Sequence, residues 1–331
     1  MSERRFAWQV NTALGVGLIA ALVAPIYLVT LHPATVWQRA IEKGGHGAVF
    51  MGIGAVLALM QRPSGAAGGR SVGQLLGAWA MAIALGALTE LTELLGVGRD
   101  PSVLDVARDA TGAALGLALL AIVERWRSTT HTRGVTIVGR TGLGAPLVAL
   151  LAAVLLGLQP LHALTVYAHR AAAFPSIAQF HGALDLALVE TEGTRAAIRP
   201  LPQPWSNGPE DRALRLGYDA GHAAAVQVLE PSPDWRGYST LAIDLTNPTP
   251  SELRLILRIF DRRHDWRSED RLNLPLVIPP GVRRTVRVPL TAVETAPVGR
   301  RLDLAHIANV MLFQQVPTGV GELYVSRIWL Q

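Results

Sequence analysis

Acidic side chains interrupt two apolar stretches of this sequence, where a charge is costly unless a partner holds it. Glu90 and Glu93 lie near the end of one stretch, and Asp105 and Asp109 lie near the start of the next. Carboxylate pairs with a histidine could bind a divalent metal ion or act as general acid and base, while basic residues among them could bind phosphate. The other candidate residues of this polar site are Lys43, His46, Arg99 and Arg108.

The spacing of the second acidic pair predicts one polar helix face. At ~100° per residue, positions four apart stay on the same side of a helix. The residues on this side are Asp105, Asp109, Gly112 and Gly116, with Arg108 at its edge. Small residues at this spacing allow a neighbouring helix to approach closely, so this polar face should be the packed one.

The elements that would position these residues are membrane helices. Hydrophobic residues make up 50% of the 331-residue chain, charged residues 17%, and the mean hydropathy is +0.30. This composition is too apolar for an ordinary soluble protein, and five stretches approach the ~20 residues that cross a bilayer. We expect transmembrane helices at 12–31, 45–61, 72–95, 103–123 and 144–163.

The loops between these spans differ in arginine content. Arginines concentrate before the first span, between the second and third, and between the fourth and fifth. By the positive-inside rule the N-terminus is cytoplasmic, and five crossings place the C-terminal part outside. The charged candidates then gather near the outer boundary of the bilayer.

We expect these candidates to form an outward-facing pocket. The arrangement is Asp105 and Asp109 on the floor, Arg99, Arg108 and Lys43 as their cationic partners, Glu90 and Glu93 on the adjacent wall, and His46 at the rim. The plainer alternative is that residues so close to the lipid headgroups only fix helix packing.

The chain after the membrane domain (1–170) and a linker (171–185) has a different pattern. Runs such as STLAIDL, ELRLILRIF and RRTVRVPL alternate in polarity and are separated by Pro, Gly and Asn turns, which predicts an all-β sandwich or jelly roll at 186–331. The chain has no cysteine, so this domain must fold without disulfides. Overall, we expect an α-helical membrane bundle followed by a β-sandwich.

Several side chains of this domain could contact a sugar. The carbohydrate-binding candidates are Trp266, Asp261, Arg271 and Asn273. Trp205, Trp235 and Tyr238 could also stack on sugar rings, but aromatic residues of a β-sandwich more often belong to its core.

The polar residues of the membrane domain also carry a family resemblance. The patterns are K-x-x-H at Lys43 and His46, E-x-x-E at Glu90 and Glu93, and a run through Arg99, Ser102, Asp105, Asp109, Gly112 and Gly116. In their order they resemble the VanZ-like family of bacterial membrane proteins, named after a protein linked to glycopeptide resistance. Glu93 and Asp109 stand where Gln and Asn are common, which makes this site more acidic. The resemblance implies a cell-envelope role and no established reaction.

The closing segments of the chain carry a second resemblance, through their strand pattern. The runs DRRHDW, RRTVRVPL and LYVSRIWL resemble carbohydrate-binding-module jelly rolls of the galactose-binding-like superfamily. This resemblance implies that the outer domain binds a glycan.

Two functions compete. In the first, an envelope protein without enzymatic activity binds a lipid headgroup or lipid-linked glycan in the pocket, and its outer domain engages a cell-envelope polysaccharide. In the second, the carboxylates serve a metal- or carboxylate-dependent hydrolase or transferase, although H-E-x-x-H and G-x-S-x-G motifs are absent from the sequence. A proton-coupled transporter is disfavoured because the sequence shows no inverted repeat.

The sequence indicates neither a cofactor nor a metal site that we can assign to residues. Nucleic acid is disfavoured as a partner, because the net charge of +5 lies entirely before residue 171 rather than on a soluble face.

Overall fold

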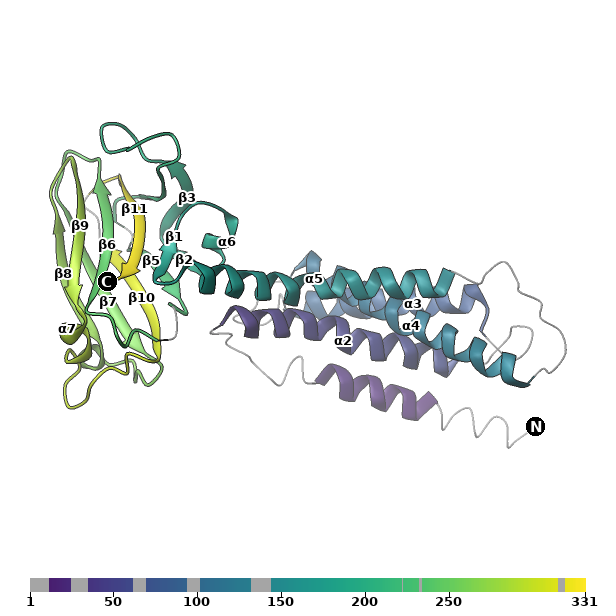
Figure 1. Ribbon diagram of the computed structural model, residues 1–331. Coiled ribbons are helices and arrows are strands. Elements are labelled where there is room, and N and C mark those ends of the chain that lie inside the picture. Colours follow the sequence, from purple (N-terminus) through teal and green to yellow (C-terminus); the bar gives the residue numbers. More distant parts are fainter. Residues whose placement is uncertain are drawn as a thin grey trace. The chain divides into compact units, whose positions relative to one another are not determined.

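The computed structural model describes residues 12–24, 35–61, 70–93, 102–131, 144–221, 223–231, 234–314 and 319–331. The chain divides into two compact units, Met1–His162 and Ala163–Gln331. The first is helical and the second is built mainly of strands, which confirms the predicted order of apolar helices followed by a β-sandwich (Figure 1).

Among the described residues, four helices are long and apolar enough to cross a membrane, where the sequence predicted five. They are α2 (Val36–Met60), α3 (Val72–Glu93), α4 (Val103–His131) and α5 (Gly144–Ala173). The helix Thr12–Ala24 is apolar but shorter, and the rest of the span expected at 12–31 lies outside the described residues.

Helix α2 begins well before the span predicted at 45–61. A capping box starts it, in which the side chains of Thr35 and Gln38 each accept a hydrogen bond from the other's backbone N–H at 3.0 Å. Hydropathy misses these first turns because they carry Arg39, Glu42 and Lys43. The capping signal therefore sets where the helix starts.

Helix α4 packs against α2 along its glycine face. A Cβ atom at Gly116 would lie 2.0 Å from the carbonyl oxygen of Met51, so the two backbones approach too closely for any side chain at this position. The buried core of the unit includes Phe50, Ile53 and Leu117. The polar face predicted for α4 is thus a packed face.

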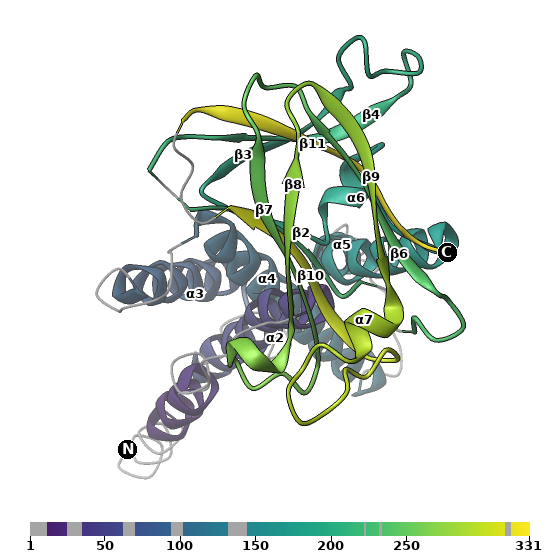
Figure 2. The same cartoon turned by 90° about the vertical axis from the view of Figure 1, so that its left-hand side faces the viewer.

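The second unit is a sandwich of two antiparallel sheets (Figures 1 and 2). The six-stranded sheet has the order β3-β4-β11-β6-β9, with β1 paired to β11. Its strands are β1 (Ser176–Gln179), β3 (Thr194–Pro200), β4 (Arg212–Tyr218), β6 (Thr240–Asn247), β9 (Val282–Pro289) and β11 (Gly321–Leu330).

The other sheet has five strands in the order β2-β5-β10-β7-β8, and Figure 2 shows β7 and β8 side by side. Its strands are β2 (Val189–Glu192), β5 (Ala224–Leu229), β7 (Leu253–Asp261), β8 (Leu272–Ile278) and β10 (Ile307–Gln314). The short helices of the unit are α6 (Ala183–Leu186), α7 (Leu290–Glu294) and the 3₁₀ turn η2 (Ser268–Asp270).

The segment 171–185, for which we expected a linker, holds the end of α5, strand β1 and the start of α6. The last turns of α5 contact the sandwich within the second unit. The Tyr167 hydroxyl donates to Oε2 of Glu230 at 2.8 Å, and Arg170 Nη1 donates to the Glu230 carbonyl oxygen at 3.1 Å. The end of α5 is therefore fastened to the strands that follow it.

The hydrophobic core of the second unit lies between the two sheets. Along β7 every second side chain is buried, including Leu255, Leu257 and Ile259, which belong to the same core as the fully buried Trp235. The alternate residues of β7 point away from the core, since successive side chains of a strand face opposite sides. These alternate side chains of β7 therefore belong to the outer face of the five-stranded sheet.

Candidate functional site

Asp109 and His46 form the buried polar centre of the membrane unit. The Asp109 side chain is 0% exposed, and its Oδ1 lies 3.5 Å from Nδ1 of His46, a distance longer than an ordinary hydrogen bond. Within the described ranges, neither carboxylate oxygen of Asp109 has a hydrogen-bond partner. A buried carboxylate without hydrogen bonds is costly, and such groups mark functional sites more often than chance.

Two neighbouring carboxylates are already engaged. Glu90 is buried near the end of α3, and its Oε2 accepts a hydrogen bond from the backbone N–H of Ser102 at 2.7 Å, where α4 begins. Asp105 forms an ion pair with Arg108 one turn further along α4. These contacts tie α3 to the start of α4 and neutralise one carboxylate.

The other predicted residues of this pocket are placed differently. Lys43 is exposed on α2 and makes no ion pair with a described residue, so it does not hold Asp105 or Asp109. Glu93 ends α3 with its side chain outside the described residues, and Arg99 lies outside them altogether. Beside Asp109, the structure puts the imidazole of His46 where we expected a guanidinium or ammonium group.

In the sandwich, planar polar side chains form a row across the outer face of the five-stranded sheet. Gln227 on β5 donates from Nε2 to Oε2 of Glu190 on β2 at 2.9 Å, and Asn309 on β10 donates from Nδ2 to Oε1 of Gln227 at 2.8 Å. Oδ1 of Asn309 is buried without a hydrogen-bond partner in the described part of the chain. One acceptor of this row is therefore unused within the described residues.

Aromatic rings lie at the β7 end of the same face. Phe260 is paired across the strands with Asn309, and its ring centroid lies 4.7 Å from that of His264 and 6.2 Å from that of Trp266. Trp266 is 80% exposed and has a φ of +71°, which is rare for a bulky residue. Strained backbone of this kind clusters at ligand sites. Trp235, by contrast, is core.

The other two aromatic candidates have structural contacts. Trp205 is half-buried beside Leu201 and Tyr324, and its Nε1 donates to the Gly281 carbonyl oxygen at 3.1 Å. Tyr238 packs on the core and makes an edge-to-face contact with Phe174. Trp266 is thus the exposed aromatic residue among those singled out in the sequence.

Two arginines complete the outer face. Arg258 lies 4.4 Å above the ring of Phe313 and donates from Nε to Oδ1 of Asn273 at 3.1 Å. Burial and the neighbouring charge of Arg271 lower the pKa of Arg258. Nη1 of Arg271 lies 3.3 Å from Nε2 of His264. We name the polar–aromatic face by its residues: Glu190, Gln227, Arg258, Phe260, Trp266, Arg271, Asn273, Asn309 and Phe313.

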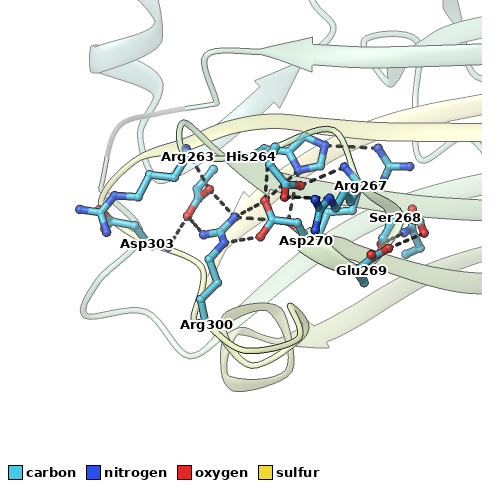
Figure 3. Close-up of polar contacts among 12 residues, drawn as sticks. Arg263, His264, Arg267, Ser268, Glu269, Asp270, Arg300 and Asp303 are labelled. Atoms are coloured by element: carbon cyan, nitrogen blue, oxygen red, sulfur yellow. Dashed lines mark hydrogen bonds and ion pairs between the residues drawn. The ribbon is translucent and has the colours of Figure 1, made fainter.

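Asp261, a predicted sugar ligand, points into the sandwich instead. Asp261 is one of the alternate residues of β7 whose side chains face the core, and it is fully buried. Its carboxylate accepts hydrogen bonds from Arg300 Nη1 at 2.7 Å and Nη2 at 3.0 Å. Arg300 also pairs with Asp270, and Figure 3 shows Arg300 beside this carboxylate. Hydrogen bonds from Arg300 hold the pKa of Asp270 well below its usual range. The network fixes the loop that carries Trp266.

His264, Asp265 and Asp270 each offer a ligand atom, all within 4.8 Å of one another, as a metal site requires. Arg300 already donates to both oxygens of Asp270, at 2.9 Å to Oδ2 and more closely to Oδ1. A divalent cation would have to displace this guanidinium or share the carboxylate with it. The set therefore suits the arginine better than a metal ion.

Most of the polar–aromatic face was not predicted from the sequence, although a signal for it was present. Arg258 and Phe260 alternate with buried aliphatic residues in the run ELRLILRIF. Reading the outward positions of each strand would have found them. Gln227 and Asn309 needed the strand order, because β5 and β10 are far apart in the sequence.

No protein-family model and no curated protein matches the chain, so membership of the VanZ-like family stays a proposal. Among solved structures, the chain is similar to a family 11 carbohydrate-binding module from Clostridium thermocellum in complex with a β-1,3-1,4-mixed-linked tetrasaccharide. The two are 14% identical with a TM-score of 0.35, over 46% of this chain and 91% of that one.

Two further similarities concern the same part of the chain. An exo-β-agarase is 15% identical with a TM-score of 0.36, over 44% of this chain and 23% of its own. A carbohydrate-binding module specific for non-crystalline cellulose is 12% identical with a TM-score of 0.34, over 48% and 93% of the two chains. These similarities concern the fold and name no ligand of this chain.

Proposed function

We propose that this chain is a multi-pass membrane protein that binds a cell-envelope glycan on the polar–aromatic face of its sandwich. The observation that carries the proposal is the row of hydrogen-bonded Glu190, Gln227 and Asn309 beside the exposed ring of Trp266. Carboxylate and amide groups match the paired hydroxyls of a sugar, while aromatic rings offer it an apolar surface.

The size of the face supports an oligosaccharide rather than a single sugar. From β2 to β8 the sheet has five adjacent strands, and four spacings of ~4.8 Å give a width of about 19 Å. Glu190 and Gln227 lie on the β2 side of this face, and Phe260 and Trp266 lie at its β7 end. A chain of sugars laid across the strands would meet both.

The glycan proposal is tested by titrating soluble polysaccharides into the full chain in lipid nanodiscs. Trp266→Ala and Gln227→Ala should each weaken binding about tenfold, since each removes a central contact. Val320→Ala is the control, because Val320 is 76% exposed on the unit but lies outside the polar–aromatic face. Equal binding by all four proteins would reject the site.

We also propose that the membrane unit binds a lipid headgroup or lipid-linked glycan near Asp109. The support is its buried carboxylate, whose oxygens have no hydrogen-bond partner among the described residues. The excess of arginines in alternate loops supports a cytoplasmic N-terminus and an outer position of the sandwich in a bacterial cytoplasmic membrane. An ammonium or hydroxyl group of a headgroup would supply the missing donor to Asp109.

The pair His46–Asp109 also supports a second candidate, a membrane-embedded hydrolase or transferase. A carboxylate beside an imidazole is the arrangement that orients a general base. Asp109→Asn separates the two functions. Under the binding proposal, the purified variant retains less lipid than the parent chain in native mass spectrometry, and neither protein turns over a lipid-linked substrate. Turnover by the parent chain that Asp109→Asn abolishes would favour the enzyme.

A further inference from the structure

We infer that the glycan on the polar–aromatic face is acidic and that its anionic groups bind between Arg258 and Arg271. This inference rests on the proposed function, because it specifies the ligand of the same face. The shared chemistry is a carboxylate, sulfate or phosphate carried by a sugar chain.

The strand register places the two arginines together. Arg258 on β7 pairs with Asn273 on β8, and Arg271 precedes Asn273 by two residues, so both guanidinium groups lie on the outer face. Diagonal neighbours of this kind are about 7–8 Å apart at their Cα atoms, within reach of long side chains. One anionic group could therefore accept hydrogen bonds from both, and a guanidinium binds carboxylate or phosphate through two parallel bonds.

Neither arginine has an acidic partner among the residues that the structure describes. Arg258 contacts the Asn273 amide and the Phe313 ring, while Arg271 contacts the His264 imidazole, and its Nε is buried without a hydrogen-bond partner there. Two like charges are thus held side by side, partly withdrawn from water. A ligand anion would relieve their repulsion.

Several other arginines of the sandwich form ion pairs with a nearby carboxylate. Arg254 lies on the same strand and the same face as Arg258, yet its Nε donates a hydrogen bond to Oε1 of Glu252 at 2.9 Å. On the other sheet, Arg215 pairs with Glu322 and Arg283 with Asp244. Other arginines of the sandwich, such as Arg327, likewise have no acidic partner among the described residues, so what sets Arg258 and Arg271 apart is that the two lie side by side on one face.

Arg271 is held in place before a ligand arrives. Its Nη1 faces Nε2 of His264, whose Nδ1 faces the carbonyl oxygen and Oδ2 of Asp270 at 3.2 and 3.3 Å. Asp270 is in turn fixed by Arg300, and Phe260 stacks on the imidazole of His264. A charged group fixed by such a chain of contacts loses little freedom on binding.

The far side of the face bears the opposite charge. Glu190 and Glu192 lie on β2, three strands away from β7. An acidic group would be repelled there and attracted at β7 and β8. The face therefore sets the direction in which an acidic glycan lies across the strands.

The test measures binding to the full chain in nanodiscs with four probes: oligogalacturonate, a sulfated galactan oligosaccharide, a glycerol-phosphate polymer and a neutral galactan oligosaccharide. We expect at least one acidic probe to bind more tightly than the neutral one, with an affinity that falls as salt rises. Arg258→Gln and Arg271→Gln should each weaken that probe about tenfold or more. The probe that binds identifies carboxylate, sulfate or phosphate as the group recognised.

Arg254→Gln is the matched control and should change the affinity less than about twofold, because its surface ion pair contributes little. Arg258→Lys and Arg271→Lys, which keep the charge, should retain more affinity than the Gln variants. If the neutral galactan binds as tightly as every acidic probe and the Arg variants leave affinity unchanged, the inference is overturned while the glycan proposal stands. Failure of all four probes to bind would overturn both.

Discussion

A Cβ atom at Gly112 would lie 2.1 Å from the carbonyl oxygen of Gly47, so the backbones of α4 and α2 touch at this point. His46 precedes Gly47, and Asp109 lies one turn before Gly112. The glycine contact therefore sets the distance between the imidazole and the buried carboxylate. The position of His46 beside Asp109 therefore depends on Gly47 and Gly112, which have no side chains.

Replacing Gly112 by alanine should disrupt this crossing. The new methyl group would meet backbone atoms of α2, which cannot rotate away, so the helices must separate and expose Asp109. We expect a lower yield of monodisperse protein and a lower melting temperature in detergent. Gly77→Ala on α3 is the control, because no atom lies within 4 Å of its Cβ position. Equal melting temperatures of the two variants would contradict the close packing.

Replacing Arg300 by methionine should destabilise the sandwich. It leaves the fully buried Asp261 and the neighbouring Asp270 without their cation, and breaking a buried pair in this way costs about 3–5 kcal/mol. The free energy of unfolding can be followed in denaturant through the tryptophan fluorescence of the chain, to which the buried Trp235 contributes. The control is Arg301→Met, since the adjacent Arg301 is 73% exposed and pairs with Glu294 at the surface. A loss no larger than in the control would refute the role of Arg300.

The sandwich should lose stability in acid through Asp270. Hydrogen bonds from Arg300 lower the pKa of this carboxyl in the folded state, so its contribution is complete above the unfolded pKa of about 3.9 and is lost as pH falls through the folded pKa. The free energy of unfolding should thus decrease as pH is lowered below about 4. Asp270→Asn should show a shallower decrease in the same titration. Parallel curves for the two proteins would show that Asp270 does not contribute.

The membrane topology can be measured with reporters fused after Gln331. Five crossings from a cytoplasmic N-terminus predict an alkaline phosphatase fusion that is active and a green fluorescent protein fusion that is dark. Four crossings would put both ends on one side and reverse this result. The reporter therefore decides whether residues 12–31 cross the membrane together with the four candidate spans of the described chain.

Local sequence patterns were enough to predict the two architectures. Long apolar runs separated by charged loops predict membrane helices, and alternation in runs such as ELRLILRIF predicts half-buried strands. The stripe Gly112 and Gly116 predicted a packed face on α4, which the structure places against α2. In each case one segment contains the whole signal.

The partners of charged residues could not be predicted in the same way, because they come from distant segments. Among the described residues Asp109 meets His46, and this pairing depends on the rotation of α2 about its axis. The turn-rich stretch around Asp261 predicted a surface ligand, but the alternation of side chains along β7 points Asp261 into the sandwich toward Arg300. Such pairs depend on packing between elements, which a single segment does not encode.

The most direct test of glycan binding is hydrogen–deuterium exchange of the full chain in nanodiscs, with and without the four galactan and glycerol-phosphate probes. The proposal predicts that a bound probe slows amide exchange in β7, β8 and β10 and in the loop that carries Trp266, because these segments form the polar–aromatic face. Exchange in β6 and β9 of the other sheet should not change. Protection confined to that other sheet, or no protection with any probe, would contradict the proposed function.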